Sequence, residues 1–177
     1  LEDAENSLRS IVDQHFALIN FLTDIGTPLP MTLLKAAETV VQSDLLRLFD
    51  EEEPDLEQME QLIQQARDWH IHLETNELGY KAGWKIDHLM GQLEESPEET
   101  DLLQRIIGIL DILSPMHLDL NLWQSQNIFF RLVRDHYARM RGKAQKEEER
   151  AQEWICLLHR LADHLYVMCP GEEENEE

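Results

Sequence analysis

Positively charged residues are scarce in this chain of 177 residues. Lysine and arginine together number 15, whereas aspartate and glutamate number 36, which gives a formal net charge of -21 at pH 7. The last seven residues contain only five of these acids, so the negative charge is spread along the whole chain. Because such a surface repels phosphate groups, we expect neither nucleic acid nor a membrane as a partner.

Long apolar runs and cysteines are also few. No apolar run reaches the roughly 20 residues that a transmembrane helix needs. The two cysteines, Cys156 and Cys169, are thirteen residues apart on the predicted last helix. That spacing corresponds to about 20 Å, which a disulfide cannot bridge. Two free thiols predict a reducing, cytoplasmic location.

Motifs for catalysis, cofactors and metals are missing from the sequence. The seven glycines stand singly, without the spacing of a phosphate-binding loop, and no serine stands in a nucleophile elbow. None of the eight histidines follows an acidic residue at the spacing of a di-iron bundle, and the pair His70 and His72 is more simply read as a helix end. We therefore expect no catalytic residue, no metal and no cofactor in this chain alone.

Amphipathic periodicity, in contrast, is present along nearly the whole chain. Apolar residues recur at three- and four-residue spacing, and no segment alternates as a half-buried strand does. The pattern predicts an all-α bundle of about six to seven mostly antiparallel helices, forming a single domain over residues 1–170. Residues 171–177 are expected to be a disordered acidic tail. The predicted helices are residues 5–25, 30–50, 54–69, a fourth after the link 71–76, 97–113, 121–141 and 145–168.

Two polar residues lie on predicted apolar faces. His15 falls near the middle of the inward face of the first helix, and Asp44 lies on the inward side of the second. Buried polar groups find hydrogen-bond partners, and antiparallel packing would bring Asp44 within about one turn of His15. We expect both residues to be buried, with Asp44 paired either to His15 or to an arginine. The alternative is that Asp44 lies at the edge of the apolar stripe.

The fourth helix carries aromatic residues on a second face. Tyr80, Trp84 and His88 recur at four-residue spacing on the side opposite the apolar face. Two explanations are open. In the commoner one the helix packs against neighbours on both sides, and in the rarer one an exposed aromatic strip docks a protein partner or a sugar ring.

The segment from Leu120 to Phe130, which opens the predicted sixth helix, mixes apolar and polar side chains. Gln126 falls inside the apolar face, where its amide needs partners. Aromatic rings, an amide and a guanidinium share the adjoining edge at helical spacing: Trp123, Asn127, Phe130 and Arg134. Such a mixture either holds the core together or binds a ligand with both apolar and polar surface.

Several short segments, taken in order, carry a family resemblance. They are Gly26-Thr27-Pro28-Leu29-Pro30, residues 40–45, residues 66–69, Gly79-Tyr80 and residues 120–127. In this order they resemble the helical, C-terminal type of domain attached to bacterial family-57-type glycoside hydrolases, which are similar to alpha-amylases and alpha-mannosidases. The resemblance covers about residues 8–137, and its most specific part is the run from Asn121 to Asn127.

The resemblance implies a non-catalytic accessory domain of a polysaccharide-acting enzyme. The catalytic carboxylates of such enzymes belong to a barrel that this chain lacks, so the implied partners are that catalytic domain and possibly an oligosaccharide. Trp123 would stack on a pyranose ring, and Gln126, Asn127 and Arg134 would bind its hydroxyls. The alternative is a stand-alone acidic protein-interaction module, adaptor-like or chaperone-like, that uses the strip at Tyr80, Trp84 and His88.

Overall fold

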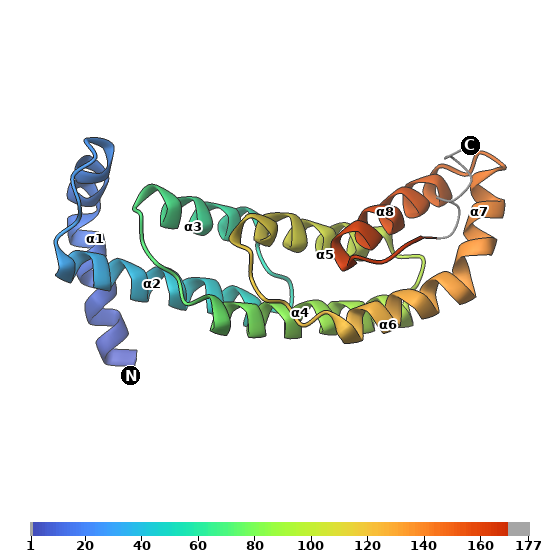
Figure 1. Ribbon diagram of the computed structural model, residues 1–177, viewed down its shortest axis with the longest axis horizontal. Helices are drawn as coiled ribbons and strands as arrows, with labels where there is room; N and C mark the ends of the chain where they lie inside the picture. The colour runs from blue at the N-terminus through green and yellow to red at the C-terminus, as the bar shows by residue number, and fades with distance from the viewer. Residues whose placement is uncertain (1, 170–177) are drawn as a thin grey trace. The chain divides into compact units, whose positions relative to one another are not determined.

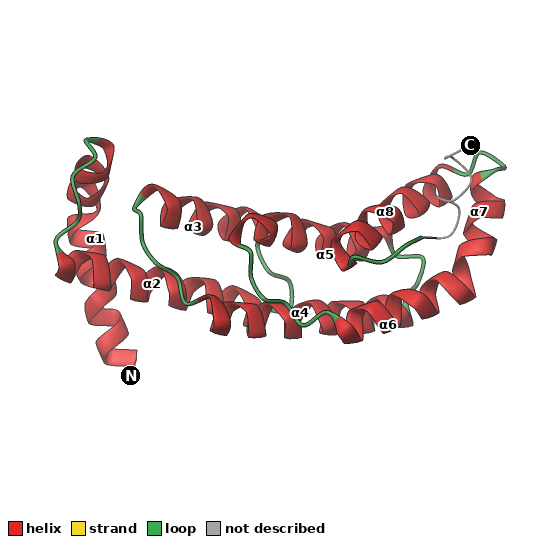
Figure 2. Ribbon diagram, viewed as in Figure 1, coloured by secondary structure: helices red, strands yellow, loops and turns green. Residues whose placement is uncertain are grey.

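The computed structural model describes residues 2–169, and the predicted acidic tail lies outside the described residues. The described chain is all-α and contains no strand, which confirms the predicted fold class (Figures 1 and 2). None of its helices is long and apolar enough to cross a membrane. The elements are α1 Glu2–Asp24, α2 Met31–Asp50, α3 Leu56–Asp68, α4 Thr75–Glu95, α5 Thr100–Leu113, a 3-10 turn η1 Ser114–Met116, α6 Trp123–Leu132, a π-helical segment η2 Val133–Tyr137, α7 Ala138–Ala144 and α8 Glu149–Leu165.

The contacts divide the chain into two compact units, Leu1–Leu78 and Gly79–Glu177. We expected one domain over residues 1–170, and whether the two units fold as one domain stays a prediction. The boundary falls inside α4, whose residues from Gly79 onwards belong to the second unit. Each unit is described by itself below.

The first unit contains α1, α2 and α3. α1 ends where Gly26 adopts a left-handed conformation (φ 68°), a geometry in which glycine carries no steric penalty. Asp55 caps α3 by accepting a hydrogen bond of 3.0 Å from the backbone N–H of Gln58. Trp69, just after α3, is buried, and its indole N–H donates to Asn20 of α1 over 2.7 Å. The end of α1 and the start of α3 therefore carry residue types that helix termini prefer.

The predicted burial of His15 is wrong. α1 buries only a narrow stripe with Val12 and Ile19 at its centre, and His15 lies to one side of that stripe, exposed. Asp44 is largely covered and accepts two hydrogen bonds from Arg9, of 2.6 and 2.8 Å, together with one from Arg47. Of the two predicted partners, the structure therefore pairs Asp44 with arginine.

The second unit contains α4 from Gly79 onwards and α5 to α8. α5 and α8 lie side by side and run parallel, because Gln104 and Asp111 of α5 bond in that order to Glu153 and Arg160 of α8. α6, η2 and α7 follow one another as a continuous curved rod, as the prediction of one long sixth helix required (Figure 1). Their π-helical middle holds one more residue per turn than an α-helix, a device that often occurs at functional sites.

Several predicted helix ends in this unit are displaced, among them the start of the last helix, which is Glu149 rather than residue 145. α5 begins at Thr100 rather than at residue 97, because the N–H of Glu99 bonds to the carbonyl of Ser96 and closes a turn there. α8 ends at Leu165 rather than at residue 168, because Tyr166 adopts a left-handed conformation (φ 54°). Cys169 therefore lies beyond the helix, and both cysteines are free thiols.

Candidate functional site

A cleft of about 600 Å³ opens in the second unit beside the N-terminus of α6. Its walls come from the end of α5, the loop of residues 117–122, the first turns of α6 and the C-terminal end of α8. Aromatic, amide and imidazole side chains line it together, among them Trp123, Gln126, Tyr166, His117, His164 and Asn121. These segments are far apart in sequence, so the cleft exists only in the folded unit.

The loop that forms one wall rests directly on α4. A Cβ atom added to Gly79 would lie only 2.9 Å from the backbone oxygen of Asp119, and one added to Gly83 would lie 3.6 Å from the backbone oxygen of Asn121. Both glycines are buried. The absence of a side chain at Gly79 is what allows the loop to approach the helix so closely.

The indole of Trp123 belongs to the cleft and not to the core. Its backbone N–H donates a hydrogen bond of 3.3 Å to the side-chain oxygen of Asn121, and α6 begins at this residue. The residue is 72% exposed although it lies beside the core residues of α6. The alternative in which Trp123 holds the core together is therefore wrong in this structure.

Gln126 lines the same cleft one turn further along α6. Its side-chain N–H₂ donates a hydrogen bond of 2.9 Å to the carbonyl of Leu165, in the last turn of α8. This bond satisfies one of the helix-end carbonyls that have no partner within the helix. It also fixes the amide, whose oxygen is a hydrogen-bond acceptor at the wall of the cleft.

The end of α8 contributes a second aromatic ring and a histidine. Tyr166, in its left-handed conformation, is 88% exposed and lines the cleft. His164 approaches Asp111 through its Nε2 atom at 2.9 Å, and Arg160 donates to the other oxygen of the same carboxylate at 2.9 Å. Asp111 of α5 therefore holds the end of α8, and with it Tyr166, at the edge of the cleft.

Two of the predicted ligand-binding residues do not line this cleft. The side chain of Asn127 donates to the carbonyl of Trp123 at 2.8 Å, which commits its amide to its own helix. Arg134 lies on η2, about 16 Å along the helical rod from Trp123 by the usual rise per residue. It forms two hydrogen bonds of 2.6 and 2.8 Å with Asp135, which raise the pKa of Arg134 and lower that of Asp135.

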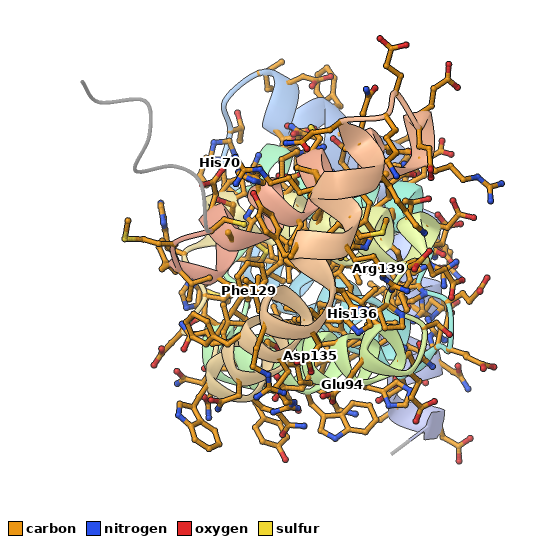
Figure 3. All side chains as sticks on the ribbon, turned by 90° about the vertical axis from the view of Figure 1, so that its right-hand side faces the viewer. His70, Glu94, Phe129, Asp135, His136 and Arg139 are labelled. Atoms are coloured by element: carbon orange, nitrogen blue, oxygen red, sulfur yellow. The ribbon has the colours of Figure 1, made fainter. Side chains whose placement is uncertain are left out.

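The π-helical segment instead carries charged side chains, and Figure 3 labels its Asp135 and His136 together with Glu94 and Arg139. Arg131 pairs with Glu94 of α4, and their hydrogen bonds lower the pKa of Glu94. Arg139 bonds to Glu98 at 2.6 Å and to the ring of His136 at 2.9 Å. Paired in this way, these charges tie η2 and α7 to neighbouring segments and leave little net charge for a ligand.

The strip predicted on α4 is exposed. Tyr80, Trp84 and His88 all face solvent, so the expectation that this helix packs on both sides is wrong in this structure. The rings of Trp84 and His88 stack with centroids 5.7 Å apart and planes inclined by 3°. None of the three lines the cleft at Trp123.

The first unit has a wider and shallower depression of about 1220 Å³ between α1 and α3. Acidic and amide side chains dominate it, and its tryptophan, Trp69, is buried with the indole N–H already bonded to Asn20. Within residues 2–169 no three histidine, cysteine, aspartate or glutamate side chains come together as a metal site would require. The cleft beside Trp123 is therefore the better candidate for a ligand.

Sequence reasoning found Trp123 and Gln126 but missed the rest of the cleft. Tyr166, His164 and His117 carry no local motif, and only the tertiary fold brings them to α6. The one available signal was the pair Gly79 and Gly83, four residues apart in a helical pattern, which indicates a close backbone approach. No family model, no curated protein and no solved structure matches this chain.

Proposed function

We propose that this chain is a non-catalytic helical accessory module of a glycoside hydrolase-like enzyme and that its cleft holds part of an oligosaccharide. The observation that carries the proposal is an exposed indole, Trp123, in a cleft of about 600 Å³ that also contains Tyr166 and Gln126. The resemblance of residues 120–127 to helical domains of family-57-type enzymes supports the same conclusion. In this proposal the module works in the cytoplasm, beside a separate catalytic domain.

A pyranose ring matches this cleft chemically. Each ring offers an apolar face of C–H groups and an edge of hydroxyls, which fit an aromatic platform and nearby amide and imidazole groups respectively. The cleft also suits a neutral ligand, because the acidic chain has a net charge of -21 and repels anions. Bond cleavage stays with the catalytic domain, since this sequence carries no phosphate-binding loop, nucleophile elbow or di-iron motif.

Sugar binding to the 177-residue chain is the direct test. Calorimetric titration with maltotriose and with the corresponding mannotriose should give weak binding, in the millimolar range that corresponds to about -4 kcal/mol. Trp123→Ala should weaken binding at least tenfold, because a central aromatic contact commonly contributes about 2 kcal/mol. Phe130→Ala is the matched control, since Phe130 is another exposed aromatic residue of α6 that does not line the cleft.

Two results would contradict the proposal. One is an absence of binding of either trisaccharide at concentrations where the chain is folded. The other is equal binding by the Trp123→Ala variant and the unmodified chain, with circular dichroism spectra and unfolding midpoints that agree.

A second candidate function, protein interaction, is favoured by the outer face of α1. Ile11, Leu18 and Phe21 are exposed on this helix, and Ile25 is exposed just after its end. Ile11, Leu18 and Ile25 belong to a seven-residue repeat, as in a helix that packs against another helix, which also includes Ala4, Leu8, His15 and Leu22. Phe21 lies outside this repeat. No acidic residue occupies any of the seven positions of the repeat, although 36 of the 177 residues are acidic. We infer that this face docks the catalytic domain of the same enzyme.

A charge placed in this face tests the docking. In a polypeptide that joins this chain to its catalytic domain, Leu18→Glu should detach the module, so that limited proteolysis separates the two parts faster. Ala17→Glu is the control, because Ala17 is exposed on the other side of α1. Equal proteolysis rates for the two variants would exclude docking through this face.

A further inference from the structure

The relative direction of α4 and α6 determines which of their exposed side chains lie near the cleft. Gly79 meets the backbone of Asp119, and one turn on Gly83 meets that of Asn121. Further along, Ser125 donates a hydrogen bond to Asp87, and Arg131 donates to Glu94 at 2.9 Å. The residue numbers of the contact partners increase together along α4 and along the segment that leads through α6. The two segments are therefore adjacent and parallel.

This register brings the two exposed aromatic groups to the same level. Trp84 lies next to Gly83, which meets Asn121, and Trp123 lies two residues after Asn121. Parallel helices pack with their axes about 8–10 Å apart, a distance that two tryptophan side chains on neighbouring helices can span. Tyr80 follows one turn back along α4, about 6 Å away.

The two exposed strips also face the same side. α4 buries Ala82, Ile86 and Leu89, and α6 buries Phe129 and Leu132, all toward the core of the second unit. On each helix the exposed rings lie on the opposite side, as the helical period of 3.6 residues requires. Tyr80 is 74% and Trp84 is 55% exposed. The rings of α4 and the ring of Trp123 therefore belong to one continuous surface.

The polar neighbours of these rings argue against a protein partner. Asp87, Gln92 and Glu95 lie near the strip on α4. Stable protein interfaces have a core depleted of charge, whereas the rings of this strip have charged and amide side chains beside them on α4. Flat rings with hydrogen-bonding neighbours match a sugar chain, and the parallel stack of Trp84 on His88 keeps one ring face fixed.

We propose that Tyr80, Trp84 and His88 form a second sugar platform, over which a longer oligosaccharide continues after its first units are seated at Trp123. This inference rests on the proposed sugar binding in the cleft. The ligand it predicts is a neutral, linear oligosaccharide of several units, held by Trp123 at one end and by the platform on α4 at the other. Trisaccharides should fill the cleft only.

Chain length separates the platform from the cleft. Calorimetric titrations of the 177-residue chain with maltotriose and maltoheptaose, and with the corresponding mannose oligomers, should show tighter binding of the heptasaccharide. Trp84→Ala should lower heptasaccharide affinity about tenfold, to the level of the trisaccharide, and leave trisaccharide affinity unchanged. Trp123→Ala should weaken both. Phe130→Ala, which removes an exposed ring two turns further along α6 and outside the cleft, should change neither.

The outcomes distinguish this inference from the function on which it rests. Unchanged heptasaccharide affinity in Trp84→Ala, with Trp123→Ala still impaired, overturns the platform and keeps the cleft. A loss of affinity for both lengths in Trp84→Ala also overturns the platform as a separate site. If the unmodified chain binds neither length, both proposals fall. Unfolding midpoints measured for every variant show whether a loss of affinity reflects binding or folding. If Trp84→Ala is unfolded, Tyr80→Ala, at the more exposed ring, repeats the test.

Discussion

Adding a single methyl group to Gly79 tests the packing that builds the cleft. In Gly79→Ala the new Cβ would lie 2.9 Å from the backbone oxygen of Asp119, closer than ordinary van der Waals contact. A backbone atom cannot rotate away as a side-chain end can. The loop of residues 117–122 must therefore move away from α4, and with it the wall of the cleft that precedes Trp123.

The change in the free energy of unfolding expected for Gly79→Ala is the sum of two opposing contributions. Replacing glycine by alanine inside a helix stabilises it by about 0.5–1 kcal/mol, whereas overpacking a tight contact costs about 1–3 kcal/mol. Gly91 lies in the same helix with nothing within 4 Å of an added Cβ, so Gly91→Ala should show the stabilising term alone. Gly83→Ala, with its nearest atom at 3.6 Å, should resemble Gly91→Ala more than Gly79→Ala.

Urea unfolding of the three variants measures the difference. We expect Gly79→Ala to be less stable than Gly91→Ala by about 1–3 kcal/mol, with the amide resonances of the loop shifted and the sugar affinity reduced. Equal stability of Gly79→Ala and Gly91→Ala, together with unchanged loop resonances, would refute the reasoning, because it would mean that the loop does not rest on α4.

Two further predictions concern single hydrogen bonds. Asn20→Ala removes the acceptor of the buried Trp69 indole and should lower the free energy of unfolding by about 1–3 kcal/mol. Asn6→Ala, at an exposed residue of the same helix, should change it by less than about 0.5 kcal/mol. Equal effects of the two substitutions in urea unfolding would contradict the role of this hydrogen bond. The hydrogen bond from Arg131 lowers the pKa of Glu94 below its ordinary value of 4.5, so its contribution to stability is present above that value and lost as the pH falls through the lowered pKa. Carbon-detected NMR titration should place the Glu94 midpoint below 4.5, and Arg131→Gln should return it there; an unshifted midpoint would show that the pair does not form in solution.

The local sequence pattern was sufficient to predict the helices, but not to predict which of their faces pack against other segments. The apolar period placed His15 on an inward face of α1, yet α1 buries only the stripe at Val12 and Ile19, and His15 is exposed. The same limit applies to α4, whose second, aromatic face was more readily explained by packing but is exposed. Periodicity identifies the apolar sides of a helix, whereas the neighbours that cover them depend on contacts between distant segments.

In the candidate site, too, some residues could be predicted from the sequence and others are brought there only by the tertiary fold. Trp123 at the start of α6 was visible as an aromatic residue at the edge of an apolar face, and Gln126 as an amide in need of a partner. The partner itself, the carbonyl of Leu165, comes from the other end of the unit. Arg134 shares the helical edge with Trp123 in sequence, but it pairs with Asp135 on the π-helical segment and lies too far along the rod to reach the cleft.

The sequence alone determined that this protein is helical, acidic and poor in catalytic motifs, because periodicity, charge and motif spacing are local properties of the chain. Only the tertiary structure decided that a loop could lie on Gly79, that the end of α8 would meet α6, and that the rings of α4 and α6 would share one surface. Those outcomes depend on which faces pack together, and close packing is settled by the shapes of many distant side chains at once.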